Sequence, residues 1–188
     1  NLDKVVKYID IPLQHSHPDV LKRMKRPVID QEELINKLRA EIKNVAIRTT
    51  FIVGYPGETD EEFEHLYNFV KKMKFERLGV FEYSREKNTY SYSLKPQIGA
   101  RVKRSRKNKI LKLQKEISKE NNLSFISKRI PCIIEEVHDN GCAVARSYAD
   151  APEVDGLVYV KTKEHLTPAE IIYPKIISAK DYDLVARL

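Results

Sequence analysis

The segment that most constrains the fold is residues 47–63, IRTTFIVGYPGETDEEF. It begins with a β-branched, apolar run that ends at Gly54, and a run of this kind predicts a strand. A tight turn over residues 55–58 follows. Thr59 and Glu62 then have the spacing of a capping box, which marks the start of a helix. The segment therefore predicts one strand–turn–helix unit.

Two neighbouring segments repeat this pattern. Residues 7–12 and 77–83 read as short apolar strands, and a polar loop follows each of them. Strands that alternate with helices favour parallel βα units. In such folds the loops at the carboxyl ends of the strands carry the chemistry. The residues that we expect at this edge are Gln14, His15, residues 54–58, Ser84 and Arg85.

Polar residues inside the strand of residues 47–54 need an explanation. Arg48, Thr49 and Thr50 interrupt an apolar run, whereas a strand buried on both faces is continuously apolar. Either the strand lines a barrel interior that opens onto a ligand, or it is an exposed edge strand. The Tyr-bearing loop of residues 84–97 likewise either covers a site or only links two elements.

The basic side chains are concentrated in one part of the chain. Residues 1–100 carry 17 basic and 15 acidic side chains, residues 101–130 carry 11 and 2, and residues 131–188 carry 6 and 10. Residues 101–122 form a predicted helix with an apolar stripe. Its basic surface indicates either contact with RNA or a solvated helix between two domains. A smaller basic cluster at residues 22–26 is either a solvated helix face or an anion contact.

Beyond residue 126 the residue pattern changes to one typical of short strands. Five strands are predicted in about 60 residues, which favours a small closed barrel of the oligonucleotide-binding type. The acidic charge of this part favours a basic partner over a polyanion. The predicted strands are residues 129–137, 142–148, 157–160, 169–178 and 182–188.

The chain contains two cysteines, Cys132 and Cys142. A two-residue turn at residues 140–141 would place Cys132 opposite Ala149, so the two sulfur atoms would not face each other. We interpret both as ordinary strand residues, because no cluster of Cys and His has the spacing of a metal site.

Several of these segments together resemble the radical S-adenosylmethionine methylthiotransferases. The similar segments are YIDIPLQHSHPDVLKRMKRP, RTTFIVGYPGETDEEF, the FEYSREKNT loop and a terminal TRAM domain. The resemblance covers essentially all 188 residues. It implies an α/β fold in which residues 1–100 form the carboxyl-terminal half of a (β/α) barrel. Residues 101–126 would then be a basic linking helix, and residues 127–188 a five-stranded TRAM barrel.

Within this family, ARSYADAPEVDGLVYV is similar to the RimO branch. That branch adds a methylthio group to the β-carbon of an aspartate in the twelfth protein of the small ribosomal subunit. The acidic terminal barrel agrees with such a basic protein substrate. Two alternatives remain, the MiaB branch, which modifies adenosines of tRNA, and a non-catalytic adaptor that binds RNA.

The resemblance also implies cofactors, S-adenosylmethionine and two 4Fe-4S clusters in the full-length enzyme. The cluster-binding cysteines of the family are absent here, and the chain begins at Asn1 rather than Met. We therefore expect a fragment that is inactive alone and has no catalytic or metal-binding residue of its own. The residues expected to bind the cofactor are Gln14, His15, Arg48, Thr50, Gly54, Gly57 and Tyr83.

Three acidic residues of the predicted barrel are candidates for substrate binding. Asp150, Glu153 and Asp155 crowd one loop. They either contact a basic protein or simply satisfy the chemistry of a turn. No segment has the length of a membrane span or the pattern of a signal peptide, so we expect a cytoplasmic protein without a membrane partner.

Overall fold

The structure is a computed structural model that describes residues 5–138 and 141–188. These residues form two compact units. The first unit consists of residues 10–43 and 47–114, and the second contains the other described residues. The division falls within one long helix, at residue 114.

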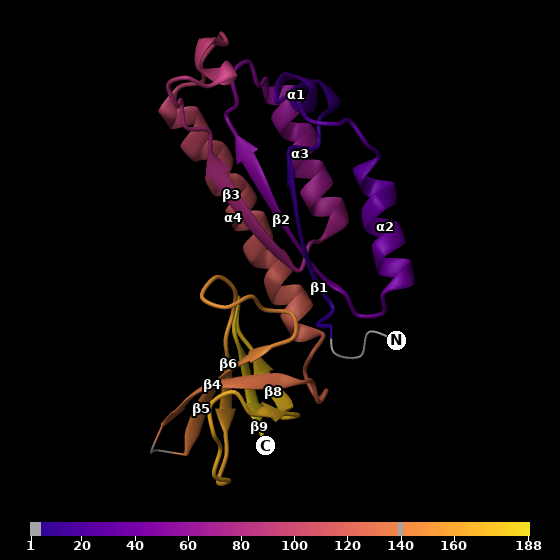
Figure 1. The fold of residues 1–188 in the computed structure, drawn as a ribbon, viewed down its shortest axis with the longest axis vertical. Helices are drawn as coiled ribbons and strands as arrows, with labels where there is room; N and C mark the ends of the chain where they lie inside the picture. Colours follow the sequence, from indigo (N-terminus) through magenta and orange to yellow (C-terminus); the bar gives the residue numbers. More distant parts are fainter. Residues whose placement is uncertain (1–4, 139–140) are drawn as a thin grey trace. The chain divides into compact units, whose positions relative to one another are not determined.

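A three-stranded sheet forms the centre of the first unit (Figure 1). Its strands are β1 (Tyr8–Gln14), β2 (Ala46–Val53) and β3 (Arg77–Glu82), in the order β1-β2-β3. Strands β2 and β3 are parallel, which confirms the predicted βα units. The first strand runs through Pro12 instead of ending there. Proline lacks an N–H group, and it is tolerated because β1 lies at the edge of the sheet.

The capping box predicted at the start of the central helix is present. Thr59 Oγ1 accepts from the backbone N–H of Glu62 at 3.1 Å, and the Glu62 carboxylate accepts from the N–H of Thr59 at 2.9 Å. A cap of this kind contributes about 1 kcal/mol to helix stability. The helical elements are α1 (Pro18–Arg23), α2 (Gln31–Glu41), α3 (Asp60–Met73), the short 3₁₀ helix η1 (Tyr90–Ser93) and α4 (Ala100–Leu123).

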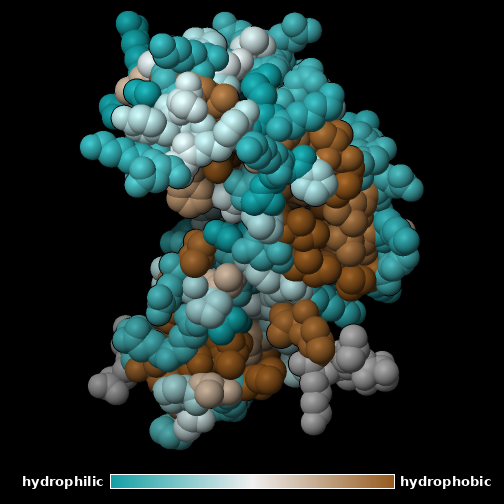
Figure 2. All heavy atoms as spheres, turned by 45° about the horizontal axis from the view of Figure 1, so that its top comes forward, coloured by the Kyte–Doolittle hydropathy of each residue, from teal (hydrophilic) through white to brown (hydrophobic). Residues whose placement is uncertain are grey.

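The two faces of the sheet have different surroundings. Phe51 points to the helical face, where it is fully buried. Its ring packs edge to face with that of Phe69 of α3, and the two ring centres are 6.3 Å apart. The opposite face carries Thr50 and Ile52, which are half-buried, and Phe81, which is 58% exposed. Strand β2 is central in this sheet, so the edge-strand alternative is wrong. In the space-filling view, apolar side chains likewise gather in contiguous brown patches of the surface (Figure 2).

The second unit contains the barrel predicted for the end of the chain. Its sheet has the strand order β7-β4-β5-β6-β9-β8, and a bridge between Arg129 and Lys175 brings β8 back to the segment ahead of β4. Strands β6 and β9 are parallel, and the other strand pairs of this sheet are antiparallel. The strands are β4 (Cys132–His138), β5 (Cys142–Ser147), β6 (Val158–Lys161), β7 (Ile171–Ile172), β8 (Lys175–Ala179) and β9 (Leu184–Arg187).

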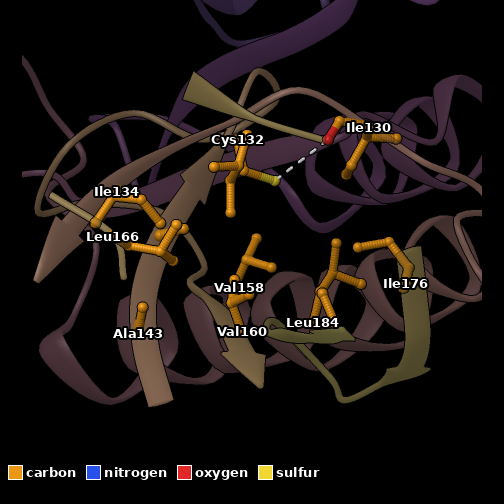
Figure 3. Close-up of a cluster of buried hydrophobic side chains, with 12 residues drawn as sticks. Ile130, Cys132, Ile134, Ala143, Val158, Val160, Leu166, Ile176 and Leu184 are labelled. Carbon is orange, nitrogen blue, oxygen red and sulfur yellow. Dashed lines mark hydrogen bonds between the residues drawn. The ribbon is translucent and has the colours of Figure 1, made fainter. Parts of the chain in front are cut away.

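The barrel therefore has five main strands and a short sixth one. The single strand predicted over residues 169–178 is divided into β7 and β8, with Pro174 between them. Proline cannot donate to a strand ladder, which explains the interruption. Apolar side chains from all of these strands fill the interior, as Figure 3 shows for Ile134, Val158 and Leu184.

One cysteine belongs to this core. Cys132 is buried, its Sγ atom lies 3.6 Å from the carbonyl oxygen of Ile130, and burial raises the pKa of its thiol to about 12 (Figure 3). It pairs with Ser147, not with Ala149 as predicted, because His138 rather than Asp139 lies opposite Cys142 and a bulge between Ile134 and Glu136 shifts the register by one more residue. Asn140 of the predicted turn lies outside the described residues.

Candidate functional site

The loop that follows β2 is held by a buried carboxylate. Glu58 is only 2% exposed, and its side chain accepts a hydrogen bond from the backbone N–H of Gly54. Arg106 of α4 pairs with the same carboxylate at 3.1 Å and donates to the carbonyl oxygen of Glu58, also at 3.1 Å. An ion pair buried in this way is hydrogen-bonded at both ends, as the cost of burying charge requires.

His15, which follows β1, belongs to the same buried network. Its Nδ1 atom accepts from the backbone N–H of His17 at 3.0 Å, so the ring proton lies on Nε2. Nε2 faces Glu58 Oε1 at 3.4 Å, and the carbonyl oxygen of His15 accepts from Gln31 at 2.9 Å. The imidazole is fully buried, and both of its nitrogen atoms contact other residues of the chain.

A second ion pair ties helix α1 to the start of α3. The guanidinium of Arg23 donates to both carboxylate oxygens of Glu62, at 2.9 and 2.6 Å. Burial alone would raise the pKa of Glu62, but the hydrogen bonds from Arg23 and Thr59 outweigh it and lower that pKa. The hydrogen bond to Glu62 raises the pKa of Arg23. The pair is therefore ionised on both sides near neutral pH.

Both glycines of this loop have positive φ angles, +73° at Gly54 and +78° at Gly57. They differ in their surroundings. A Cβ atom at Gly54 would overlap the side chain of Lys103 of α4, whereas at Gly57 the nearest atom would be Arg23 Nε at 3.7 Å. The close approach at Gly54 is thus to the protein's own helix.

A cavity of about 620 Å³ lies at the carboxyl edge of the sheet, between the ends of β1 and β3 and the residues that follow α1. Its size is in the usual range for small-molecule sites. Basic, aromatic, apolar and hydroxyl side chains all contribute to the wall. The lining residues are Gln14, Met24, Lys25, Arg26, Ile52, Tyr55, Phe81, Glu82, Tyr83, Ser84, Thr89, Tyr90 and Ser91.

Two tyrosines of this wall differ in their hydrogen bonding. The rings of Tyr55 and Tyr83 meet edge to face at 5.2 Å. Tyr55 Oη donates to the carbonyl oxygen of Arg23 at 3.0 Å, and burial, reinforced by Tyr83, raises the pKa of Tyr55. Tyr83 is 7% exposed, and its buried Oη atom has no hydrogen-bond partner among the described residues. Since buried hydroxyl groups are normally paired, this one favours a ligand in the cavity.

Basic side chains lie beside the same cavity. Lys25 Nζ is 3.7 Å from the centre of the Tyr90 ring, a cation–π contact that links the segment after α1 to η1. Gln14 has a φ angle of +68° and forms no side-chain hydrogen bond within residues 5–138 and 141–188. Its amide is therefore available to the cavity.

Arg48 and Thr50 lie on the same face of β2 as Ile52, which lines the cavity, but farther from the carboxyl end of the strand. Arg48 pairs with Asp10 of β1 at 2.6 Å. A Cβ atom at Gly79 of β3 would lie 3.6 Å from Thr50 Oγ1 and 3.8 Å from Arg48 Nη2, so both side chains share this face. The face is thus polar in its centre.

The structure brings Gln14 and Tyr83 together at the cavity, with Thr50 and Arg48 on the adjoining face. His15, Gly54 and Gly57 instead belong to the buried loop after β2. Sequence reasoning missed several lining residues, although the basic cluster after α1 and the Tyr-bearing loop were signals for some of them. The missed residues are Met24, Ile52, Phe81, Glu82, Thr89 and Tyr90.

The acidic loop of the barrel is stabilised from within. Asp150 is buried and accepts a hydrogen bond from Ser147 Oγ. Asp155 accepts from the backbone N–H of Ala151 at 2.9 Å and from Tyr8 Oη at 2.7 Å. Glu153 is exposed, at a φ angle of +61°. The turn chemistry considered above therefore accounts for the placement of two of the three carboxylates.

No helix in residues 5–138 and 141–188 has the length and apolar character needed to cross a bilayer. No group of three or more His, Cys, Asp or Glu side chains in the same residues could hold a metal ion.

Comparisons with known proteins identify two families within the chain. The Radical SAM superfamily matches residues 1–70, and the TRAM domain family matches residues 126–188. A ribosomal protein uS12 methylthiotransferase RimO from Thermoanaerobacter sp. is 53% identical over 98% of the chain. Proteins of the same name from Caldanaerobacter subterraneus and Acetivibrio thermocellus are 51% and 44% identical, over 98% and 100% of it. The chain spans 42% of the length of each of these three relatives.

Proposed function

We propose that the chain is part of a RimO-type radical SAM methylthiotransferase, in which it supplies the cofactor pocket and the substrate-recognition domain. The whole enzyme would add a methylthio group to the β-carbon of an aspartate in ribosomal protein uS12. Because the chain spans 42% of its relatives, this reaction is proposed for the complete protein and not for these residues alone.

The observation that carries the proposal is the cavity at the carboxyl edge of the sheet. Its residues fit S-adenosylmethionine in three respects. Ile52 and Tyr55 offer apolar and aromatic surface to an adenosyl group, and Gln14 offers an unpaired amide. The buried Oη atom of Tyr83 lacks a partner that a polar ligand would supply. When bound, S-adenosylmethionine supplies the radical chemistry, and the protein positions it.

The other predicted cofactor residues have supporting parts in this proposal. Arg48 and Thr50 would extend the polar surface below the cavity. His15, Gly54 and Gly57 would keep the neighbouring loop in one conformation, because they belong to its buried network or to its tight turns.

Iron–sulfur clusters do not fit this chain. Its two cysteines lie in the barrel unit, and one of them is buried in the core with a strongly raised pKa. No suitable ligand group exists in the described residues. We therefore assign the clusters of the family to the part of the enzyme outside this chain.

The barrel would contact the protein substrate. Residues 131–188 carry 6 basic and 10 acidic side chains, which favours a basic partner. Within the proposed contact, Glu153 would present its exposed carboxylate, while Asp150 and Asp155 would fix the loop that carries it. An acidic, ordered loop of this kind matches a basic ribosomal protein.

The test is the affinity of the complete enzyme for S-adenosylhomocysteine, measured by calorimetry. Tyr83→Phe removes one hydroxyl group from the cavity and should weaken binding about tenfold, the usual value of one buried hydrogen bond to a ligand. Tyr67→Phe, on helix α3 outside the cavity lining, is the matched control and should leave the affinity unchanged. Equal affinities of the two variants would contradict the assignment of the cavity.

A further inference from the structure

A second cavity, of about 390 Å³, lies among the helices of the first unit. It is lined by the start of helix α2, the middle of α3 and the loop between β1 and α1 (Figure 1). It shares no lining residue with the cavity at the carboxyl edge of the sheet. We call it the helical pocket, and the lining residues that its chemistry depends on are Ser16, Ile29, Asp30, Gln31, His65 and Phe69.

Gln31 contributes a buried hydrogen-bond acceptor to this pocket. The residue is 7% exposed, and its Nε2 atom donates to the carbonyl oxygen of His15 at 2.9 Å, which fixes the orientation of the amide. The other end of the amide, Oε1, is buried and has no hydrogen-bond partner within residues 5–138 and 141–188. Since buried polar atoms are normally paired, the pocket favours a ligand that carries a hydrogen-bond donor.

The charged side chains of the pocket favour a cation. The Asp30 carboxylate accepts from the backbone N–H of Glu33 at 2.8 Å and so caps α2, but no basic side chain of the described residues pairs with it. Glu32 pairs with Lys72 of α3 at 2.6 Å, so these two charges balance each other. Asp30 therefore leaves one uncompensated negative charge at the pocket. An anion would meet this charge as well as the unpaired acceptor of Gln31.

The histidine of the pocket does not oppose a cation. Burial, reinforced by the imidazoles of His17 and His15, lowers the pKa of His65 below its usual 6.5. Its ring is therefore neutral at neutral pH. The Nδ1 atom of His65 is hydrogen-bonded to Ser16 Oγ, at 2.9 Å, which holds the ring against the loop that follows β1. The α3 side of the pocket thus adds a polar but uncharged group.

We propose that the helical pocket binds the side chain of a lysine residue of a basic polypeptide. The ammonium group carries only donors and one positive charge, which suits the unpaired acceptor of Gln31 and the carboxylate of Asp30. The methylene stem of a lysine packs on apolar surface. Ile29, which is exposed, and Phe69, which is half-buried, offer such surface in the same pocket.

The position of the pocket fits a polypeptide that approaches the cofactor cavity. Ser16 of the pocket lies two residues beyond Gln14, the last residue of β1, which lines the cofactor cavity. A chain that reaches one cavity thus passes close to the other. The polypeptide is the basic protein substrate of the proposed function, so the identity of the partner rests on that proposal, whereas the lysine subsite rests on the pocket alone.

The experiment is a titration of the complete enzyme with Nα-acetyl-lysine amide, followed by NMR of ¹³C-labelled histidine. The signal of His65 should shift and saturate, and the Nε-acetylated form of the probe, which lacks the charge, should leave it in place. Asp30→Asn keeps the cap of α2 but removes the charge, so it should weaken binding about threefold. Glu33→Gln is the matched control, because it removes an exposed charge of the same helix outside the pocket lining and should leave the affinity unchanged.

A second pair of variants tests the buried acceptor. Gln31→Met removes it and should weaken binding of the probe about tenfold, as expected for a hydrogen bond to a charged group. Gln114→Met makes the same chemical change on α4, where the amide is also buried and donates to the carbonyl oxygen of Phe75 at 2.9 Å. It should leave binding unchanged. Equal losses within either pair of variants would overturn the proposal.

The substrate protein decides the occupant. Ribosomal protein uS12 should shift the same His65 signal and displace the probe. If the probe saturates the pocket and uS12 does not move the signal, the pocket binds free amines and the proposal fails. Asp30→Asn should bind S-adenosylhomocysteine as the parent enzyme does. A failure of lysine binding with this affinity intact would thus contradict the lysine subsite and not the cofactor cavity.

Discussion

Two loops at the carboxyl edge of the sheet differ in whether a buried polar side chain has a hydrogen-bond partner. In the loop after β2, the carboxylate of Glu58 is buried and bonded to Gly54 and Arg106. In the loop after β3, the hydroxyl of Tyr83 is also buried, but it has no partner among the described residues. The buried carboxylate of the first loop is satisfied without a ligand, and the buried hydroxyl of the second is not. The comparison thus separates a side chain that holds its own loop from one that a ligand could pair.

The largest expected effect comes from neutralising the buried carboxylate. Glu58→Gln leaves the buried guanidinium of Arg106 with only the exposed carboxylate of Asp60 as a charged partner, so we expect the free energy of unfolding to fall by about 3 kcal/mol. Glu82→Gln makes the same chemical change at the edge of the cavity, where the side chain is half-buried, and should cost less than about 0.5 kcal/mol. Urea denaturation of the two variants measures the difference. Similar losses would remove the distinction between the loops.

A second comparison separates backbone strain from packing. Gly54→Ala and Gly57→Ala both place a Cβ atom at a positive φ angle, which costs about 1 kcal/mol. Only Gly54→Ala also displaces the side chain of Lys103, so we expect it to cost about 2 kcal/mol in total. Thermal unfolding of both variants provides the measurement. If Gly57→Ala is as destabilising as Gly54→Ala, the packing of α4 against the loop is not responsible.

The Arg23–Glu62 pair should make stability depend on acidity. The folded state lowers the pKa of Glu62 below its usual 4.5, so its contribution is complete above that pH and is lost as the pH falls through the folded pKa. Arg23→Gln should therefore cost about 1–2 kcal/mol at pH 7 and less in acid. Lys22→Gln is the control, because its partner Asp19 is exposed and such pairs contribute little. An equal loss for Arg23→Gln at pH 7 and pH 3 would contradict this role.

The smallest expected effect is also the most direct test of the difference between the two tyrosines. Tyr83→Phe removes a buried hydroxyl that has no partner, so stability should change by less than about 0.5 kcal/mol or increase. Tyr55→Phe removes the hydrogen bond to Arg23 and should cost about 1 kcal/mol. Chemical denaturation without ligand compares the two. A larger loss for Tyr83→Phe would mean that its hydroxyl is satisfied within the protein.

Local signals in the sequence predicted the elements well, because neighbouring residues determine them. Thr59 and Glu62 are three residues apart, and they cap the start of α3 as predicted. The division between β7 and β8 was missed, although Pro174 was a local signal for it. For strands, the partner decides as much as the segment itself, and the register of β4 and β5 therefore differed from the prediction.

The site was harder to predict, because its contacts join distant residues. Arg106 reaches Glu58 across 48 positions, and Arg23 reaches Glu62 across 39. No spacing rule connects such pairs. Net charge was similarly incomplete as a guide, since it gave the sign of the barrel's charge but not the row that Lys161, Arg187 and Lys175 form across three strands.

The burial of Cys132 makes the barrel chemically addressable at one position. A thiol with a pKa near 12 has almost no thiolate at neutral pH and does not react with maleimides or iodoacetamide. Cys142 is half-buried on the outer side of β5 and lies directly beside Lys161. A single fluorophore or spin label can therefore be attached there without mutagenesis. The wild-type chain thus carries its own attachment point for a reporter of what the barrel binds.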